Sequence, residues 1–154
     1  MISKKTLLAI ALIVAPLALF SAKKGYDAYD IIGKLQAKLK AIKGFRLIGS
    51  TITMKLDVNI TNPTDTAFDV ATGGLFIVRR INVFDKQNNL IAFSEPNISD
   101  ISIPPYGTVT LTDLPVSSQV GSIFNALFNS PSTNPDDYRV ETIIETSTGQ
   151  TVTI

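Results

Sequence analysis

The order of apolar and polar residues divides the chain into three parts. Residues 6–22 (TLLAIALIVAPLALFSA) contain no charged residue and would be apolar on every side of a helix. Residues 26–45 (YDAYDIIGKLQAKLKAIKGF) place apolar residues on one face of a helix, with lysines largely elsewhere. From Phe45 onward the apolar period shortens from about 3.6 residues to about 2, which is the period of a β-strand.

The first part predicts a transmembrane helix that stays on the chain as a membrane anchor, residues 1–24. At about 1.5 Å per residue it would be about 25 Å long, the short end of the range for a membrane span. Pro16 would kink this helix but is tolerated in lipid. The side chains expected in the membrane are Leu7, Leu8, Ile10, Leu12, Ile13, Val14, Leu17, Leu19 and Phe20.

Two other interpretations of this segment stay open. A cleaved signal peptide also begins with lysines and an apolar run, but cleavage after Ala22 would place Phe20 where a small residue is required. A buried core helix would normally have a polar side, which this run lacks. The orientation is open as well, because the positive-inside count places the body on the cytoplasmic side and the usual bias of signal anchors places it outside.

The second part, residues 25–44, predicts a basic amphipathic helical arm that ends at Gly44. Directly after an anchor, such a helix would lie on an anionic membrane surface or dock on a partner; packing on its own body is the alternative. Direct binding to nucleic acid is not expected, because few aromatic residues interleave with the basic ones. The lysines assigned to this contact are Lys23, Lys24, Lys34, Lys38, Lys40 and Lys43.

The third part, residues 45–154, predicts a mainly-β antiparallel sandwich of about seven strands and one helix. Residues 51–61 (TITMKLDVNIT) alternate strictly and predict a half-buried strand, with Asp57 on its polar face. The segment DKQNN predicts the turn of one hairpin, and Gly149 marks the turn of a second hairpin. Residues 118–128 (SQVGSIFNALF) have helical spacing and predict the helix.

Two positions in these strands break the simple pattern. Pro63 has no amide hydrogen with which to continue a ladder, and the Asn62 side chain can bond to nearby backbone groups. Asn62-Pro63 therefore predicts a fold-determining turn across the sandwich. Arg79 and Arg80 are adjacent in a strand, which predicts one charge on each face: an inward charge would protect an edge or meet a partner, and solvation at the surface is the alternative.

Composition excludes several kinds of chemistry. Cysteine, histidine and tryptophan are absent, which removes disulfides, Cys/His zinc sites and histidine-based triads. Asp136-Asp137 could supply half of a calcium site, but a solvated loop is the simpler interpretation. We therefore predict no catalytic residues, no metal and no cofactor.

Charge is distributed unevenly along the chain. Residues 1–50 carry nine basic and two acidic residues, whereas residues 51–154 carry five basic and eleven acidic residues. A basic N-terminal part joined to an acidic body is typical of chains that meet a membrane surface or nucleic acid.

The body resembles the water-stress and hypersensitive-response (WHy) domain of the late-embryogenesis-abundant (LEA) group 2 family. The resemblance rests on LDVNITNPTDTAFDV, with its Asn-Pro turn after a long strand, and on ISIPPYGTVTLTDLPVS before a helix. It covers Phe45–Ile154, and Thr64 stands where the family usually has asparagine. The resemblance implies a non-catalytic sandwich used in stress protection, lipid binding or envelope assemblies, often with an N-terminal anchor.

These observations predict a non-catalytic, single-pass membrane protein that positions a β-sandwich in a cell envelope or a membrane-containing virion. Its partners would be the lipid membrane and other structural proteins, and a homo-oligomer is compatible with the sequence. The alternative is a lipid- or small-ligand-binding module. That alternative requires an interior pocket of about 300 Å³ or more, lined by residues such as Phe76, Phe84, Phe93 and Phe128.

Overall fold

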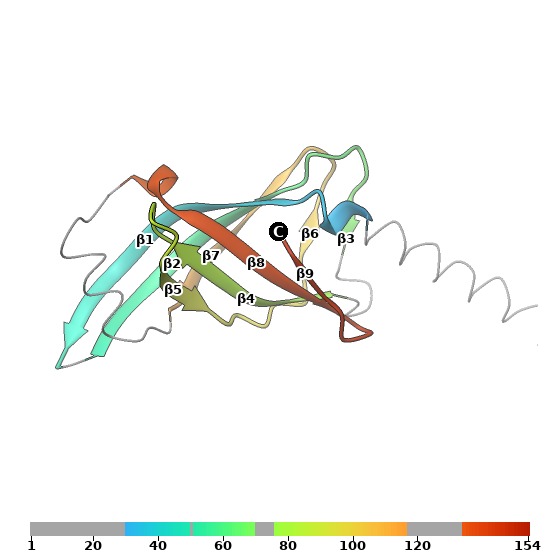
Figure 1. Ribbon diagram of the computed structural model, residues 1–154. Coiled ribbons are helices and arrows are strands. Elements are labelled where there is room, and N and C mark those ends of the chain that lie inside the picture. Colours follow the sequence, from blue (N-terminus) through green and yellow to red (C-terminus); the bar gives the residue numbers. More distant parts are fainter. Residues whose placement is uncertain (1–29, 50, 70–75, 117–133) are drawn as a thin grey trace, which may run out of the picture.

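Two antiparallel β-sheets packed against each other form the folded body of the protein (Figure 1). The computed structural model describes residues 30–49, 51–69, 76–116 and 134–154. Within these ranges the elements are β1 (Gln36–Ile48), β2 (Thr51–Thr61), β3 (Phe68–Asp69), β4 (Phe76–Phe84), β5 (Leu90–Ser94), β6 (Ser102–Ile103), β7 (Thr108–Pro115), the short 3-10 helix η1 (Pro135–Asp137), β8 (Arg139–Thr146) and β9 (Thr151–Thr153). The predicted mainly-β class is confirmed, and the described residues already hold more strands than predicted.

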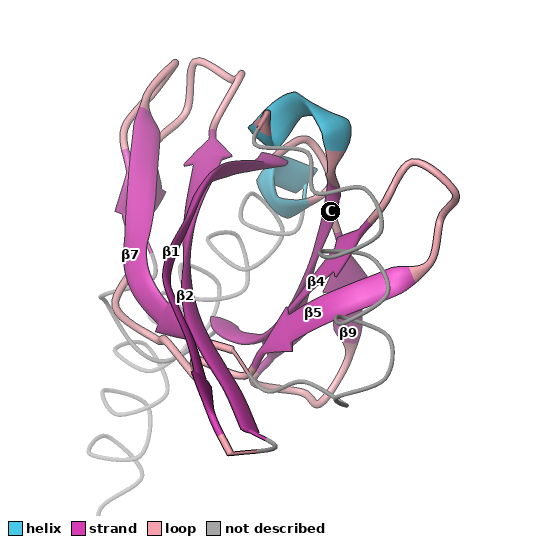
Figure 2. Ribbon diagram, turned by 90° about the vertical axis from the view of Figure 1, so that its left-hand side faces the viewer, coloured by secondary structure: helices cyan, strands magenta, loops and turns pink. Residues whose placement is uncertain are grey.

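The strands are arranged in two larger sheets and one small pair. The first sheet has the order β1-β2-β7, the second has the order β5-β4-β8-β9, and β3 pairs with β6. Figure 2 shows the two larger sheets on opposite sides of a shared interior. Ser94 Oγ of β5 donates a hydrogen bond to the carbonyl oxygen of Pro115 in β7 at 2.6 Å, which joins the two sheets. The β4–β5 and β8–β9 hairpins are the two that the sequence predicted.

Two predicted elements lie outside the described residues. They are the membrane anchor at residues 6–22 and the helix at residues 118–128. Within the part of the chain that the structure describes, no helix combines the length and the apolar character needed to cross a membrane.

The predicted amphipathic helix at residues 25–44 is wrong over its second half, because Gln36–Ile48 form strand β1. Residues 30–32 are helical and are followed by a turn. Leu35 and Leu39, both buried, fit either structure, since a separation of four residues returns to the same face of a helix and of a strand. Antiparallel pairing with β2 along the length of β1 stabilises the strand and not the helix. The sandwich therefore begins within the segment that was predicted to be the arm.

Strand β2 has the predicted bounds and the predicted apolar face. Met54, Leu56, Val58 and Ile60 are all buried in the core between the sheets. Asp57 was predicted on the solvent side, yet it is only 3% exposed. Its burial follows from irregularities in both neighbouring strands.

Arg79 and Arg80 both lie on the outer face of the second sheet, which corrects the prediction of one charge on each face. The register of β4 against β8 shifts between Val78 and Arg80. This β-bulge inserts Arg79 as an extra residue and resets the alternation, so that Ile81 faces the core again. The two arginine side chains remain 41% and 34% exposed.

The turn after β2 is built around the side chain of Asn62, which has no solvent exposure. Its Nδ2 donates to the carbonyl oxygen of Thr66 at 2.7 Å and lies 3.3 Å from the carbonyl oxygen of Pro104. Its Oδ1 accepts from the amide nitrogen of Thr64 at 3.0 Å and from Thr64 Oγ1 at 2.7 Å. One side chain thus holds together the loop after β2 and the loop before β7.

Replacing Asn62 should therefore cost much more stability than replacing a polar residue at the surface. For Asn62→Ala we expect the free energy of unfolding to fall by about 3 kcal/mol, because several buried backbone groups lose their partner. The matched control is Asn59→Ala, which removes one half-buried hydrogen bond, to Thr110 Oγ1, and should cost about 1 kcal/mol. Urea denaturation of both variants measures the difference, and equal losses would contradict the role of Asn62.

Candidate functional site

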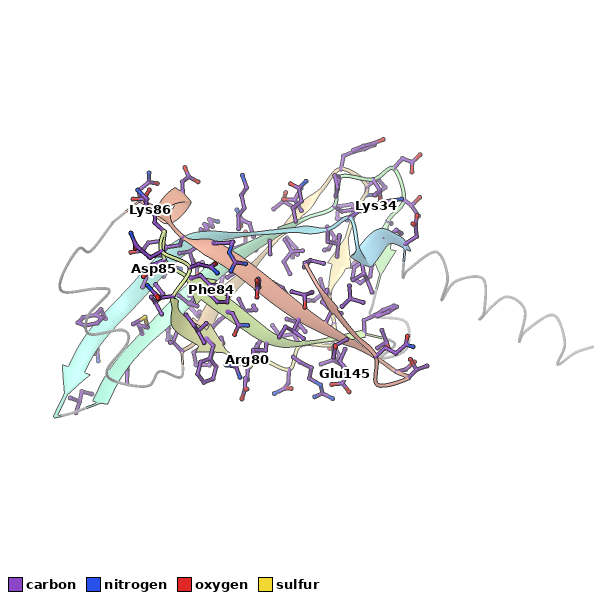
Figure 3. All side chains as sticks on the ribbon, in the orientation of Figure 1. Lys34, Arg80, Phe84, Asp85, Lys86 and Glu145 are labelled. Carbon is purple, nitrogen blue, oxygen red and sulfur yellow. The ribbon has the colours of Figure 1, made fainter. Side chains whose placement is uncertain are left out.

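Those lysines of the predicted basic arm that the structure describes lie on one turn and one strand. Lys34 lies in the turn before β1 and pairs with Asp30 at 2.6 Å (Figure 3 labels Lys34). Lys38, Lys40 and Lys43 are exposed along β1. Outside the described residues lie Lys23, Lys24 and all the side chains predicted to lie in the membrane.

The solvent-facing side of the first sheet brings these strand lysines together with a ladder of polar residues. We call it the lysine face, and its members are Lys38, Lys40, Lys43, Lys55, Asn59, Thr61, Thr108 and Thr110. Thr110 Oγ1 donates to Asn59 Oδ1 at 2.8 Å, and the hydroxyls of Thr61 and Thr108 are also 2.8 Å apart. Such cross-strand pairs stabilise a sheet without closing its surface to a partner.

Two lysines of this face form no direct ion pair within the described residues, although the charge of Lys40 acts on the nearby Asp57 carboxyl. Lys40 Nζ lies 3.5 Å from the hydroxyl of Thr110, and Lys38 forms no ion pair with a described carboxylate. Because β1 is the outermost of the described strands in its sheet, lysines along it also discourage unwanted pairing with another strand. The lysine face therefore exposes positive charge at the side of the sandwich.

Asp57 forms the most buried ionic contact of the described body. It bonds to Lys43 Nζ, and its Oδ1 accepts from the amide nitrogen of Asp113 at 2.9 Å. The register of β2 shifts on both sides of this residue, against β1 and against β7, and Asp113 adopts a φ of 55°. The two bulges surround the carboxylate with polar partners, which is what a buried charge requires.

This contact shifts the proton affinity of both partners. The hydrogen bond from Lys43 and then the amide of Asp113 hold the pKa of the Asp57 carboxyl below its ordinary value, although burial opposes the shift. The hydrogen bond to Asp57 raises the pKa of the Lys43 amine above its ordinary value. Both shifts have the sign expected for an ion pair in the folded protein.

The outer face of the second sheet carries arginines stacked on aromatic rings. The guanidinium carbon of Arg80 lies 3.9 Å from the ring centre of Phe93, and that of Arg139 lies 4.2 Å from the ring centre of Phe84 (Figure 3 labels Arg80 and Phe84). The prediction that Phe84 and Phe93 line an interior pocket is therefore wrong. These rings sit under cations at the surface.

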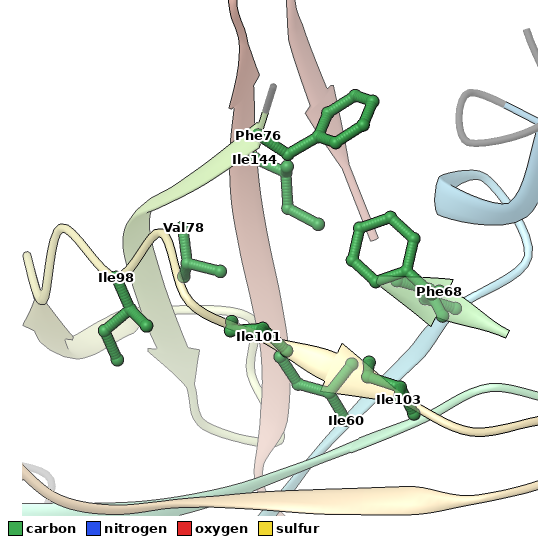
Figure 4. A pocket seen from close by; sticks show the side chains of 9 residues that line it. Ile60, Phe68, Phe76, Val78, Ile98, Ile101, Ile103 and Ile144 are labelled. Carbon is green, nitrogen blue, oxygen red and sulfur yellow. The ribbon is translucent and has the colours of Figure 1, made fainter. Parts of the chain in front are cut away.

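The pocket that the described residues line between the sheets is small. Its volume is about 10 Å³, and Figure 4 shows the apolar side chains that line it, Phe76 and Phe68 among them. A volume of this size holds no more than about one water molecule. Phe128, the last residue predicted to line an interior cavity, lies outside the described residues.

An open polar cleft of about 440 Å³ lies where β1, the β4–β5 turn and η1 meet. Most of its charges are already engaged: Lys86 pairs with Asp137 at 2.8 Å. Asp85 accepts from the amide nitrogen of Asn89 at 2.8 Å and from Asn89 Nδ2 at 3.0 Å, and these bonds lower the pKa of the Asp85 carboxyl. Asp136 also lines the cleft, but no group of three potential ligands among the described residues could hold a metal ion.

The chain matches no protein-family model and no curated protein sequence.

Sequence reasoning missed the role of Asp57 and the gathering of polar residues on the lysine face. Asp57 occupies a normal solvent-side position in the alternation of β2, and only the bulges in its neighbours bury it. The lysine face could not be recognised because β1 was interpreted as a helix. The spacing of Lys38 and Lys40, two residues apart, was the available signal for a strand.

The Asp57 contact should make the free energy of unfolding depend on pH in the acidic range. Because folding lowers the pKa of Asp57, its contribution is present above about pH 4, the ordinary carboxyl range, and is lost as the pH falls through the folded-state pKa. We expect Asp57→Asn to be less stable than wild type at neutral pH and to lose less stability between about pH 5 and 2.

The measurement is the free energy of unfolding at several pH values. Asp113→Asn is the control, because it keeps the backbone amide that bonds Asp57 and removes an exposed carboxylate whose effect on Lys43 is smaller than that of Asp57. Parallel pH profiles for wild type and Asp57→Asn would show that this carboxylate does not contribute.

Proposed function

We propose that this chain is a non-catalytic, single-pass membrane protein whose β-sandwich takes part in a larger assembly, in a cell envelope or a membrane-containing virion. The observation that carries the proposal is the short distance along the chain between the apolar run and the folded core. Residues 6–22 are uncharged and flanked by lysine pairs, whereas Ile31 and Ile32 are already buried, at 6% and 0% exposure.

The connection leaves the body little freedom. Residues 23–29 span at most about 25 Å even when fully extended, at about 3.5 Å per residue. A body whose first core residue follows so soon after a membrane anchor is held at the membrane surface. Such placement suits a protein that occupies a fixed position in an assembly.

The described surface supports an interaction role. Groups with shifted pKa values are useful pointers to catalysis, but Asp57, Lys43 and Asp85 each make hydrogen bonds that hold strands or turns in place. The lysine face, with Lys38 and Lys40 unpaired by described carboxylates, fits an acidic neighbour in the assembly. The resemblance to the WHy domain of the LEA group 2 family points to the same non-catalytic role and remains a prediction.

The alternative of a ligand-binding module receives no support from the part of the interior that the described residues line. The apolar pocket of about 10 Å³ is far below the size of a lipid or small-ligand site.

The anchor can be tested in the full chain with two charges placed in the middle of the apolar run. We expect the wild-type chain to stay with membranes through alkaline carbonate extraction, and Leu12→Arg/Ile13→Arg to be released, because arginine costs about 3 kcal/mol at the centre of a span. The matched control is Ile48→Arg/Leu90→Arg, which adds the same charges at exposed apolar positions of the body.

Retention of both double variants, or release of the wild type, would contradict membrane anchoring. Protease protection on sealed membranes then reports on which side the body lies.

A further inference from the structure

Tyr106 stands out among the described residues as a large aromatic side chain that is left in solvent at a backbone cost. It is 73% exposed and has a φ of 52°. Residues other than glycine, asparagine and aspartate rarely adopt this left-handed conformation. Glycine or asparagine would adopt this backbone conformation at lower cost, so the tyrosine at this position goes against the local backbone preference.

The turn that carries Tyr106 is held rigidly. The amide nitrogen of Tyr106 donates to the carbonyl oxygen of Thr64 at 3.0 Å, and that of Gly107 donates to the carbonyl oxygen of Pro104 at 3.0 Å. A Cβ atom on Gly107 would lie 2.4 Å from Pro104 Cγ, so a side chain would not fit there. The buried Asn62 amide also reaches the Pro104 carbonyl. The ring therefore projects from a fixed platform.

This platform lies at the end of the sandwich where the N-terminal segment joins. Gln36 at the start of β1 is opposite Thr61, and Thr61 is opposite Thr108 at the start of β7. Strands lie about 4.8 Å apart, so Gln36 and Thr108 are separated by about 10 Å. Figure 1 shows helical residues 30–32, drawn in blue, at the same end as the loops between β2 and β3 and between β6 and β7.

When the strands of the first sheet are perpendicular to the bilayer, with the Gln36 end at its surface, the opposite end of the sheet does not touch the bilayer. Ile48, at the end of β1, is about 40 Å from Gln36 at about 3.3 Å per residue. Residues 23–29 bridge at most about 25 Å. An anchor that ends at Ala22 thus holds the Tyr106 end, and not the Ile48 end, against the membrane.

The chemistry of the Tyr106 end suits lipid headgroups. Tyrosine is enriched at membrane–water interfaces, because its ring is apolar and its hydroxyl is polar. The Asp30–Lys34 pair at this end is neutral overall, and the exposed prolines Pro104 and Pro105 add no charge. Asp65 in the neighbouring turn is exposed and acidic, so the contact proposed here relies on the tyrosine ring and not on positive charge. The unpaired lysines lie on the side of the sandwich and not beside Tyr106.

We infer that the Pro104–Gly107 turn is a membrane-contact site, with the Tyr106 ring lying in the headgroup region of the bilayer that holds the anchor. This contact sets the sandwich upright on the membrane, with the lysine face turned sideways. The inference rests on the membrane anchoring proposed above.

The absence of tryptophan from the chain makes a direct test available. Tyr106→Trp and Ile48→Trp each give the full chain a single tryptophan, at opposite ends of β1–β2–β7. Each variant is reconstituted into phosphatidylcholine vesicles, with and without lipids brominated near the headgroup end of their acyl chains. Flotation of the vesicles checks the anchor independently of the fluorescence.

We expect brominated lipid to quench the fluorescence of Tyr106→Trp at least twofold and aqueous acrylamide to quench it weakly. Ile48→Trp should show the opposite behaviour. Asp65→Trp places a second reporter in the neighbouring turn. It should show the same quenching as expected for Tyr106→Trp, and it replaces that variant if Tyr106→Trp folds poorly.

Three results would overturn the inference. If the chain floats with vesicles but both reporters at the Tyr106 end remain open to acrylamide, the anchor is real and the contact is not. If brominated lipid quenches Ile48→Trp equally, the sandwich lies on its side. A chain that does not float removes the proposed anchoring and the contact with it.

Discussion

The buried amide of Asn62 is the interaction on which the closed sandwich most depends. The central strand β2 ends there, and Pro63 supplies no amide hydrogen with which to pair the chain further. The loops that follow would leave backbone groups unsatisfied in a buried place, and the Asn62 side chain, with its two donors and one acceptor oxygen, meets several of them at once. The turn before β7 takes its position from the same contacts, so both loops at this end of the body share one point of support.

A second buried polar group, Asp57, shows how the first sheet tolerates a buried charge. The strands on both sides of β2 depart from regular pairing beside this residue, and the departures bring Lys43 and the amide of Asp113 to the carboxylate. The irregular pairing and the charge depend on each other. Without the bulges the carboxylate would lack its donors, and without the carboxylate the amide of Asp113 would lose its acceptor. The three strands of the sheet are thereby joined through side chains as well as through backbone.

The sequence predicted the elements that are determined by residues close together in the chain. Strand β2 and the two hairpins follow from alternation and from turn residues that stand next to each other in the chain. Strand β1 did not follow, because Leu35 and Leu39 fit two periods and only pairing with a distant strand separates them. The bulge at Arg79 was equally invisible, since its register is set by β8, more than 60 residues away in the sequence. Tyr106 was passed over because an exposed tyrosine in a Pro-Pro loop has no unusual pattern until its backbone angle is known.

The pairing of β1 with β2 has a mechanical consequence for an anchored body. Tension from a membrane anchor would enter the sandwich at the N-terminal end of β1 and run along the strand. The hydrogen bonds between antiparallel strands are perpendicular to that direction, so the pull loads the bonds of the β1–β2 ladder together, in shear, and does not open them one after another. The buried side chains of Leu35 and Leu39 add resistance to sliding. The first strand of the body is thus placed to resist a pull from the anchor through many hydrogen bonds at once.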